Sequence, residues 1–180
     1  MSHLGTAAFV IAVAASGVLS CAGAREGGPL PATSAISVEV AVPAGQAITW
    51  GMPIPESQQE GELIAVELLG RTNLEIAGIA GCIGWTMESD GTRTHCAPVT
   101  ADGWPPNDVA IEAISGLALP VDTDQALGIL VGIRRVDEGA IGTVDAVKVS
   151  YVSGGVAYFI VEPWSMTLRP VNEPALLDDT

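Results

Sequence analysis

Hydrophobic residues alternate with polar or small residues along several stretches of this chain, and this alternation constrains its fold more than any other feature. Residues 36–42, ISVEVAV, carry Ile or Val at every second position, and residues 127–133 carry Leu, Ile or Val in the same way. Successive side chains of a β-strand point to opposite faces of a sheet, so each stretch predicts a strand with one buried face.

Glycine and proline are spread along the chain as turn residues would be, with 21 Gly and 12 Pro. They bound further apolar stretches at 63–69, 74–80 and 114–119, which we interpret as additional strands. A short helix at 105–116, after Pro105-Pro106, is the one helical candidate. About seven to nine strands spaced roughly ten residues apart predict an all-β protein, an antiparallel immunoglobulin-like β-sandwich over residues 36–170.

The clearest single unit is a hairpin near the end of the chain. Val147, Val149 and Tyr151 share one face of a predicted strand. The turn residues Ser153-Gly154-Gly155 follow, and the apolar stretch 156–161 predicts the returning strand. The remaining residues, 171–180, form a predicted acidic tail.

The first 20 residues have the composition of an export signal. Residues 4–20 are apolar and uncharged, and the first charged residues of this region, Arg25 and Glu26, follow shortly afterwards. A stretch of this length is short for a membrane-spanning helix and typical of a signal-peptide core. We therefore expect residues 1–20 to be a signal peptide and the mature domain to lie outside the cytoplasm.

The sequence Leu19-Ser20-Cys21-Ala22 resembles the lipobox of bacterial lipoproteins. The resemblance implies cleavage before Cys21, a lipid on its sulfur and a place on the extracytoplasmic face of the cell membrane, where two or more acyl chains give stable anchoring. Residues 21–35 would then be the lipidated cysteine and a flexible tether with a reach of about 45 Å. The alternatives are a soluble secreted protein cleaved after Ala24, and an uncleaved helical anchor.

Two further cysteines, Cys82 and Cys96, lie in the predicted exported domain. An even pair in an oxidising compartment predicts a disulfide. The alternative is a copper or zinc site formed by these two residues with His95, to which Met87 could add a further ligand. His95 and Cys96 are adjacent, however, and would point to opposite faces of a strand, so the disulfide is favoured.

The net charge and the lack of catalytic and cofactor-binding motifs argue against several classes of function. The net charge is −14 and the chain holds one lysine, Lys148, so nucleic-acid binding, which needs clustered cations, is not expected. Anionic lipid headgroups would also repel such a chain, and membrane association should therefore come from the lipid. His95 is the only histidine beyond the signal, and no nucleophile elbow, phosphate loop or dinucleotide fingerprint is present. We predict neither an enzyme nor a cofactor.

The loop Gly103-Trp104-Pro105-Pro106 is the candidate partner-binding element, because a rigid loop can present an aromatic side chain. The alternative is that Trp104 covers part of the core. The sequence thus predicts an envelope lipoprotein with a non-catalytic binding, accessory or scaffold role, for which an envelope protein complex is the expected setting. A carrier of a small ligand or a soft metal is the alternative function, and a secreted enzyme is less expected.

Overall fold

The computed structural model describes residues 23–87, 93–96, 100–107, 109–122 and 126–171. Within these residues the chain forms thirteen strands and no helix, as expected for an all-β protein. In chain order the strands are β1 (Arg25–Glu26), β2 (Ile36–Val42), β3 (Ile48–Ile54), β4 (Gly61–Leu69), β5 (Leu74–Ile83), β6 (Trp85–Met87), β7 (Arg93–His95), β8 (Thr100–Asp102), β9 (Leu127–Arg135), β10 (Gly142–Val144), β11 (Ala146–Ser153), β12 (Val156–Glu162) and β13 (Trp164–Pro170).

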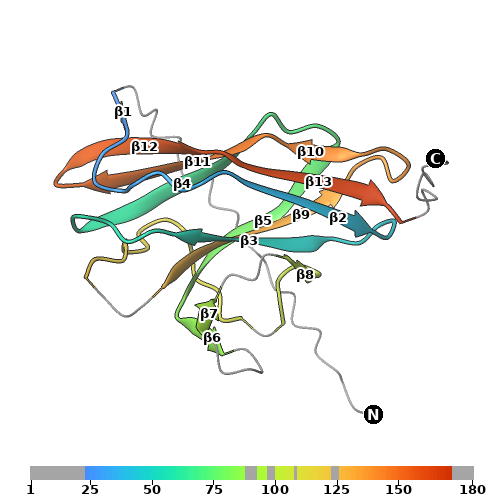
Figure 1. The fold of residues 1–180 in the computed structure, drawn as a ribbon, viewed down its shortest axis with the longest axis horizontal. Helices are drawn as coiled ribbons and strands as arrows, with labels where there is room; N and C mark the ends of the chain where they lie inside the picture. Colours follow the sequence, from blue (N-terminus) through green and yellow to red (C-terminus); the bar gives the residue numbers. More distant parts are fainter. Residues whose placement is uncertain (1–22, 88–92, 97–99, 108, 123–125, 172–180) are drawn as a thin grey trace, which may run out of the picture.

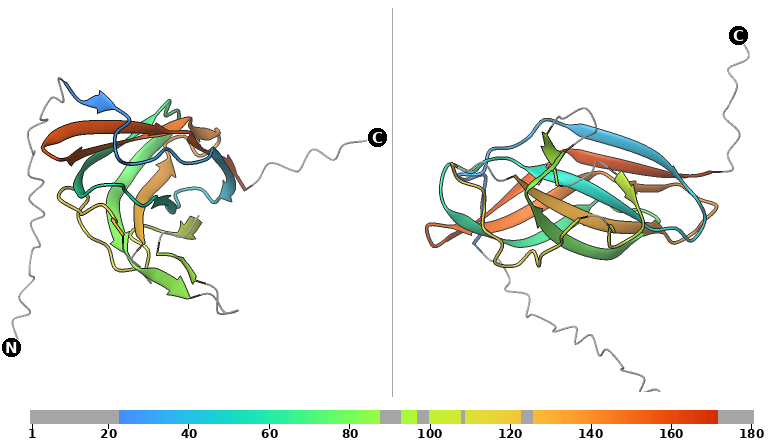
Figure 2. Two further views of the ribbon diagram at one scale, coloured as in Figure 1. Left: turned by 60° about the vertical axis from the view of Figure 1, so that its left-hand side comes forward. Right: turned by 90° about the horizontal axis from the view of Figure 1, so that it is seen from below.

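The strands form two packed layers. One layer contains β1-β12-β11-β4 and β10-β13-β2, and the other contains β5-β9-β3-β8 (Figure 1). The left view of Figure 2 shows the short β6–β7 hairpin outside the second layer. Eight strands have seven or more residues, which agrees with the predicted β-sandwich and its strand count. Two pairings depart from a purely antiparallel arrangement: β2 is parallel to β13, and β1 is parallel to β12.

The predicted C-terminal hairpin is confirmed and is longer than expected. β11 pairs with β12, and β10 pairs with β13, so residues 142–153 run antiparallel to residues 156–168 with a break near Pro163. Gly154 and Gly155 have φ values of 55° and 75°. Consecutive positive φ values at the two central positions are those of a type I′ turn, which matches the twist of the flanking strands. The half of this hairpin near its turn pairs with β4, and the other half pairs with β2.

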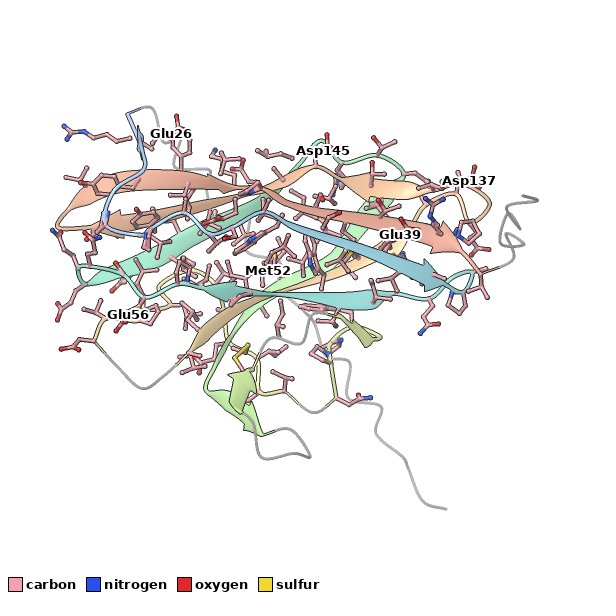
Figure 3. All side chains as sticks on the ribbon, in the orientation of Figure 1. Glu26, Glu39, Met52, Glu56, Asp137 and Asp145 are labelled. Atoms are coloured by element: carbon pink, nitrogen blue, oxygen red, sulfur yellow. A yellow bond between two sulfur atoms is a disulfide. The ribbon has the colours of Figure 1, made fainter. Side chains whose placement is uncertain are left out.

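The core lies between the two layers and is built from alternate residues of the long strands. Trp50, Met52, Ile129, Tyr151 and Trp164 are all buried there. Figure 3 shows Met52 between the layers. The alternation in residues 147–151 thus predicts their burial correctly, since a strand with one face on a core buries every second side chain.

Strand β3 was not among the predicted strands, because Gly51 and Pro53 interrupt its pattern. Proline cannot donate a ladder hydrogen bond and is therefore confined to unpaired strand edges. β8 pairs with β3 only at residues 48–50, so Pro53 faces an edge that β8 does not occupy. The other edge of β3 pairs with β9 along its full length.

Strand β9 occurs where predicted, but its expected half-burial is wrong. Gly128, Leu130 and Gly132 on its second face are buried as well. Leu130 packs with Cys82 and Cys96 in a small cluster that Trp104 and Val109 partly cover. A segment outside the sandwich therefore closes the second face of this sheet.

The two predictions for residues 105–119 are also wrong. The described part of 105–116 is not helical, and 114–119 is not a regular strand. Instead Glu112 exchanges two backbone hydrogen bonds of 2.8 Å with Gly81, and Leu119 donates one of 2.8 Å to Gly61. These isolated bridges to strand edges pair backbone N–H and C=O groups of the segment, so it needs no helix to pair them.

The segment 25–33, expected to be part of the flexible tether, packs against the sandwich. β1 pairs with Tyr158 and Phe159 of β12, and Leu30 is buried. Cys21 and the predicted signal peptide lie outside the described residues, as do residues 172–180 of the predicted tail. Among the described residues, no helix is long and apolar enough to cross a membrane.

Candidate functional site

The disulfide predicted between Cys82 and Cys96 is present, with 6.0 Å between the Cα atoms. Cys82 belongs to the end of β5, and Cys96 directly follows β7. The backbone N–H of Cys96 donates to the carbonyl of Gly84 at 3.3 Å, so the bridge closes the base of the β6–β7 hairpin. While this bond is intact, neither sulfur is a thiolate able to bind a soft metal ion. Within the part of the chain that the structure describes, no group of three His, Cys, Asp or Glu residues could hold a metal.

The position of Trp104 is set by β3. The hydroxyl of Thr49 donates to the carbonyl of Gly103 at 2.7 Å, and the N–H of Gly103 donates to the carbonyl of Ala47 at 2.9 Å. These bonds bring the next residue, Trp104, over the outer face of the sheet, where a Cβ on Gly78 or Gly132 would overlap its ring.

The other residues of the predicted loop differ in exposure. Pro105 is exposed, Pro106 is buried and Trp104 is partly buried. The peptide bond between Trp104 and Pro105 is cis. Trp104 therefore covers part of a core, which is the alternative interpretation of this residue, while Pro105 faces solvent.

Two glycines in the sequence could have indicated this contact. Gly78 and Gly132 are cross-strand partners in β5 and β9, and together they form a flat area on which an aromatic ring can lie. Glycine inside a strand often marks the close approach of another group. The two positions are far apart in sequence, so the pairing becomes visible only in the sheet.

A second feature, an open groove of about 690 Å³, lies at the end of the sandwich that carries the β11–β12 turn. No pattern in the sequence predicted it. Its wall combines both layers, since β4 and the hairpin turn contribute one side and the ends of β5 and β9 contribute the other. The lining residues are 60–62, 118–121 and 152–155, together with Ile83, Ala126 and Leu127.

Hydrogen bonds to backbone carbonyls fix the shape of this groove. Leu119 donates to Gly61, and Ser57 donates to the carbonyl of Pro120 at 2.7 Å. The Ser153 hydroxyl donates to the carbonyl of Glu60 at 2.6 Å, which ties the hairpin turn to the start of β4. A side chain at Gly61 would meet the carbonyl of Val152 at 2.5 Å, so glycine is required for this close approach.

The groove combines apolar surface with negative charge. Ile83 is 40% exposed and contributes apolar surface to the lining. Glu60 and Glu62 line the groove and are exposed, whereas none of the described residues that line it is basic. The groove is therefore suited to a ligand that is partly apolar and carries positive charge.

The N-terminal segment is held on the sandwich by two buried polar side chains, Tyr151 near the groove and Glu162 at the opposite end of β12. The Tyr151 hydroxyl donates to the carbonyl of Gly27 at 2.7 Å and accepts from the N–H of Leu30 at 3.2 Å. The Glu162 carboxylate accepts from the N–H and the hydroxyl of Thr33, at 2.9 and 2.6 Å, through Oε2. Its other oxygen, Oε1, is buried without a hydrogen-bond partner among the described residues.

Tyr151 also has a perturbed acidity. Desolvation by burial raises the pKa of its hydroxyl, and the nearby Tyr158 raises it further. The hydrogen bond from Leu30 acts in the opposite direction, because it favours the phenolate. The group is therefore held as a neutral hydrogen-bond donor to Gly27.

Comparisons with known proteins give little further information. No family model matches the chain, and no curated protein matches it. One similar solved structure is a mutant form of the CFA/I adhesin CfaE of enterotoxigenic E. coli, with a TM-score of 0.35 and 8% sequence identity. The match covers 81% of this chain but 48% of the adhesin chain, so this chain spans about half of that protein's length.

Proposed function

We propose that the chain is a membrane-anchored extracytoplasmic lipoprotein whose β-sandwich has a non-catalytic binding or accessory role. The anchoring part rests on the sequence Leu19-Ser20-Cys21-Ala22 after an apolar, uncharged stretch. A disulfide in the domain fits an oxidising compartment and hence export. The proposed partners are the membrane, through the lipid, and an envelope protein complex.

The observation that carries the binding role is the open groove beside the β11–β12 turn. Its volume lies within the range of ligand sites in proteins, about 300–1,000 Å³. Its walls are held by backbone hydrogen bonds, and it leaves Ile83 exposed. A preformed apolar surface of this kind favours binding, because little conformational freedom is lost when a ligand enters.

The proposed loop of Trp104, Pro105 and Pro106 is a secondary candidate surface, because Pro105 and part of the Trp104 ring remain exposed. A small-ligand carrier is the second candidate function, and the same groove would serve it. The soft-metal version has less support, because the disulfide occupies both cysteine sulfurs.

The anchor is tested by metabolic labelling with radioactive palmitate in the native cells. We expect label on the wild-type protein and none on a Cys21→Ala variant, which should lose its mature membrane-bound form. A wild-type protein found unlabelled in the medium and beginning at Arg25 would contradict the anchor and support free secretion.

A further inference from the structure

We propose that the groove beside the β11–β12 turn opens close to the membrane and binds an extended, basic segment of a membrane protein. This inference rests on the proposed lipid anchor for its location, and on the charges and shape of the groove for its ligand.

The N-terminal segment docks near the groove. Arg25 is the Cα partner of Tyr158, which lies three residues beyond Gly155 of the turn that lines the groove. At about 3.3 Å per residue this separation is roughly 10 Å along the strand. In Figure 3, Glu26 of β1 and Glu56 of the β3–β4 connection lie toward one end of the molecule, and Asp137 lies at the other.

The docking leaves little free chain between the domain and a lipid on Cys21. Four Cα–Cα steps join Cys21 to Arg25, so they span at most about 14 Å. A fully free segment to residue 35 would have allowed about 45 Å. The pairing of Arg25 with Tyr158 and the hydrogen bonds of Tyr151 to Gly27 and Leu30 therefore tie the end of the tether to the groove end of the domain, within this reach of the proposed anchor.

The chemistry of the lining selects the class of ligand. Glu60 and Glu62 lie two residues apart at the start of β4 and are both exposed, and the described part of the lining holds no basic side chain to neutralise them. Ile83 and the partly exposed Val121 supply apolar contacts beside these charges. A segment that alternates basic and apolar side chains in an extended conformation would match both features.

The test is photo-cross-linking of the full acylated protein in its native membrane. A photoreactive phenylalanine analogue replaces Val121 in the groove, and in a control protein it replaces Val136, which is 65% exposed and follows the far end of β9. We expect adducts from position 121 and far fewer from position 136. Mass spectrometry should map these adducts to a basic extracytoplasmic segment of a membrane protein.

Charge variants test the specificity. Glu60→Gln/Glu62→Gln should lower the adduct yield at position 121 by about threefold to tenfold, the effect expected for two exposed ion pairs. Asp137→Asn/Glu138→Gln removes the same charge at the other end and should leave the yield unchanged. Raising the salt concentration should lower the yield only when Glu60 and Glu62 are present.

Adducts to lipid alone, adducts to a neutral or acidic segment, equal yields from positions 121 and 136, or no adduct would each overturn the inference. Palmitate labelling of the same cells separates this result from the proposed anchor. Labelled protein without basic adducts contradicts the groove's ligand but leaves the anchor standing. Unlabelled protein in the medium contradicts the anchor and, with it, the membrane-proximal position of the groove.

Discussion

The indole of Trp104 lies across Gly132, in the space that a side chain at position 132 would occupy. Gly78, the cross-strand partner of Gly132, leaves room for the same ring. The ring therefore closes the outer face of a sheet whose other face already packs on the main core. This arrangement makes the stability of the sheet depend on a loop residue.

Replacing Gly132 by Ala should destabilise the protein, because the added methyl group overlaps the Trp104 ring. We expect Gly132→Ala to lower the free energy of unfolding by about 1–3 kcal/mol. Trp104→Ala should lower it by about 3 kcal/mol, the low end for a buried aromatic, because this side chain is only partly buried. In the Gly132→Ala/Trp104→Ala double variant, Gly132→Ala should cause no further loss of unfolding free energy. Urea denaturation of the variants measures these free energies.

Gly139→Ala is the matched control for this cycle, since the nearest atom to its Cβ would be Asp137 Oδ1 at 3.5 Å. Additive costs in the double variant would contradict the contact. A Trp104→Ala protein of unchanged stability that loses a partner would instead favour recognition by the loop.

Removing the disulfide with Cys82→Ser/Cys96→Ser should lower the free energy of unfolding by about 3 kcal/mol, the value for a closed loop near 15 residues. The two cysteines are 14 residues apart. Thermal unfolding followed by circular dichroism measures the change. Adding a reductant should shift the wild-type midpoint toward that of the variant and leave the variant unchanged, and a reductant-insensitive wild type would contradict this role for the bond.

Replacing Thr33 by Ala should loosen the N-terminal segment. The substitution removes the hydroxyl that donates to Glu162 Oε2 at 2.6 Å and leaves the buried carboxylate with one donor among the described residues. We expect a loss of about 1–3 kcal/mol, because a buried polar group that loses a hydrogen-bond partner is costly. Denaturation curves and faster hydrogen exchange in residues 25–33 would measure it.

The neighbouring Ser34→Ala is the control for this change, because Ser34 is exposed. If Thr33→Ala and Ser34→Ala have the same small effect, Glu162 does not hold the segment.

The free energy of unfolding should fall at high pH because the Tyr151 hydroxyl ionises. Its pKa is raised in the folded protein, mainly by desolvation, so the unfolded chain loses this proton first, near pH 10. The contribution of the neutral hydroxyl is therefore full below pH 10 and is lost as the pH rises through the folded pKa. Unfolding free energies measured from pH 8 upward should show this decline.

Tyr151→Phe provides the comparison. The variant should be less stable at pH 8, because it lacks the bonds to Gly27 and Leu30, and it should decline less above pH 10. Parallel declines in the two proteins would show that Tyr151 does not cause the loss.

Local sequence patterns were sufficient to predict the strands and turns that depend on near neighbours. The alternation in residues 36–42 and 147–151, the Gly154-Gly155 turn and the Cys82–Cys96 pair each express a short-range requirement: an extended strand, a positive φ, or a short loop closed in an oxidising compartment. In residues 36–42 the predicted buried face is incomplete, because Ile36 is 38% exposed and Val38 and Val40 are only partly buried. These requirements act within a few residues, so they are visible along the chain.

The features that the sequence did not predict each depend on segments distant in sequence. Strand β3 was not predicted because Gly51 and Pro53 interrupt its pattern, and only the structure shows which of its edges is unpaired. The burial of Leu130 on the second face of β9 follows from packing by the disulfide segment and Trp104. The groove requires β4, β9 and the hairpin turn to meet at one end of the sandwich.

The sequence by itself determined that this chain forms strands, that Gly154-Gly155 is a tight turn and that Cys82 pairs with Cys96. Backbone conformation and the closure of a short loop act locally, so both can be predicted from neighbouring residues. Only the tertiary structure decided which faces are covered, that residues 25–33 pack on the sandwich rather than hang free, and that Glu60, Glu62 and Ile83 share one groove. Burial depends on what packs against a residue, and in a sandwich of long-range strand pairs that partner lies far away in the sequence.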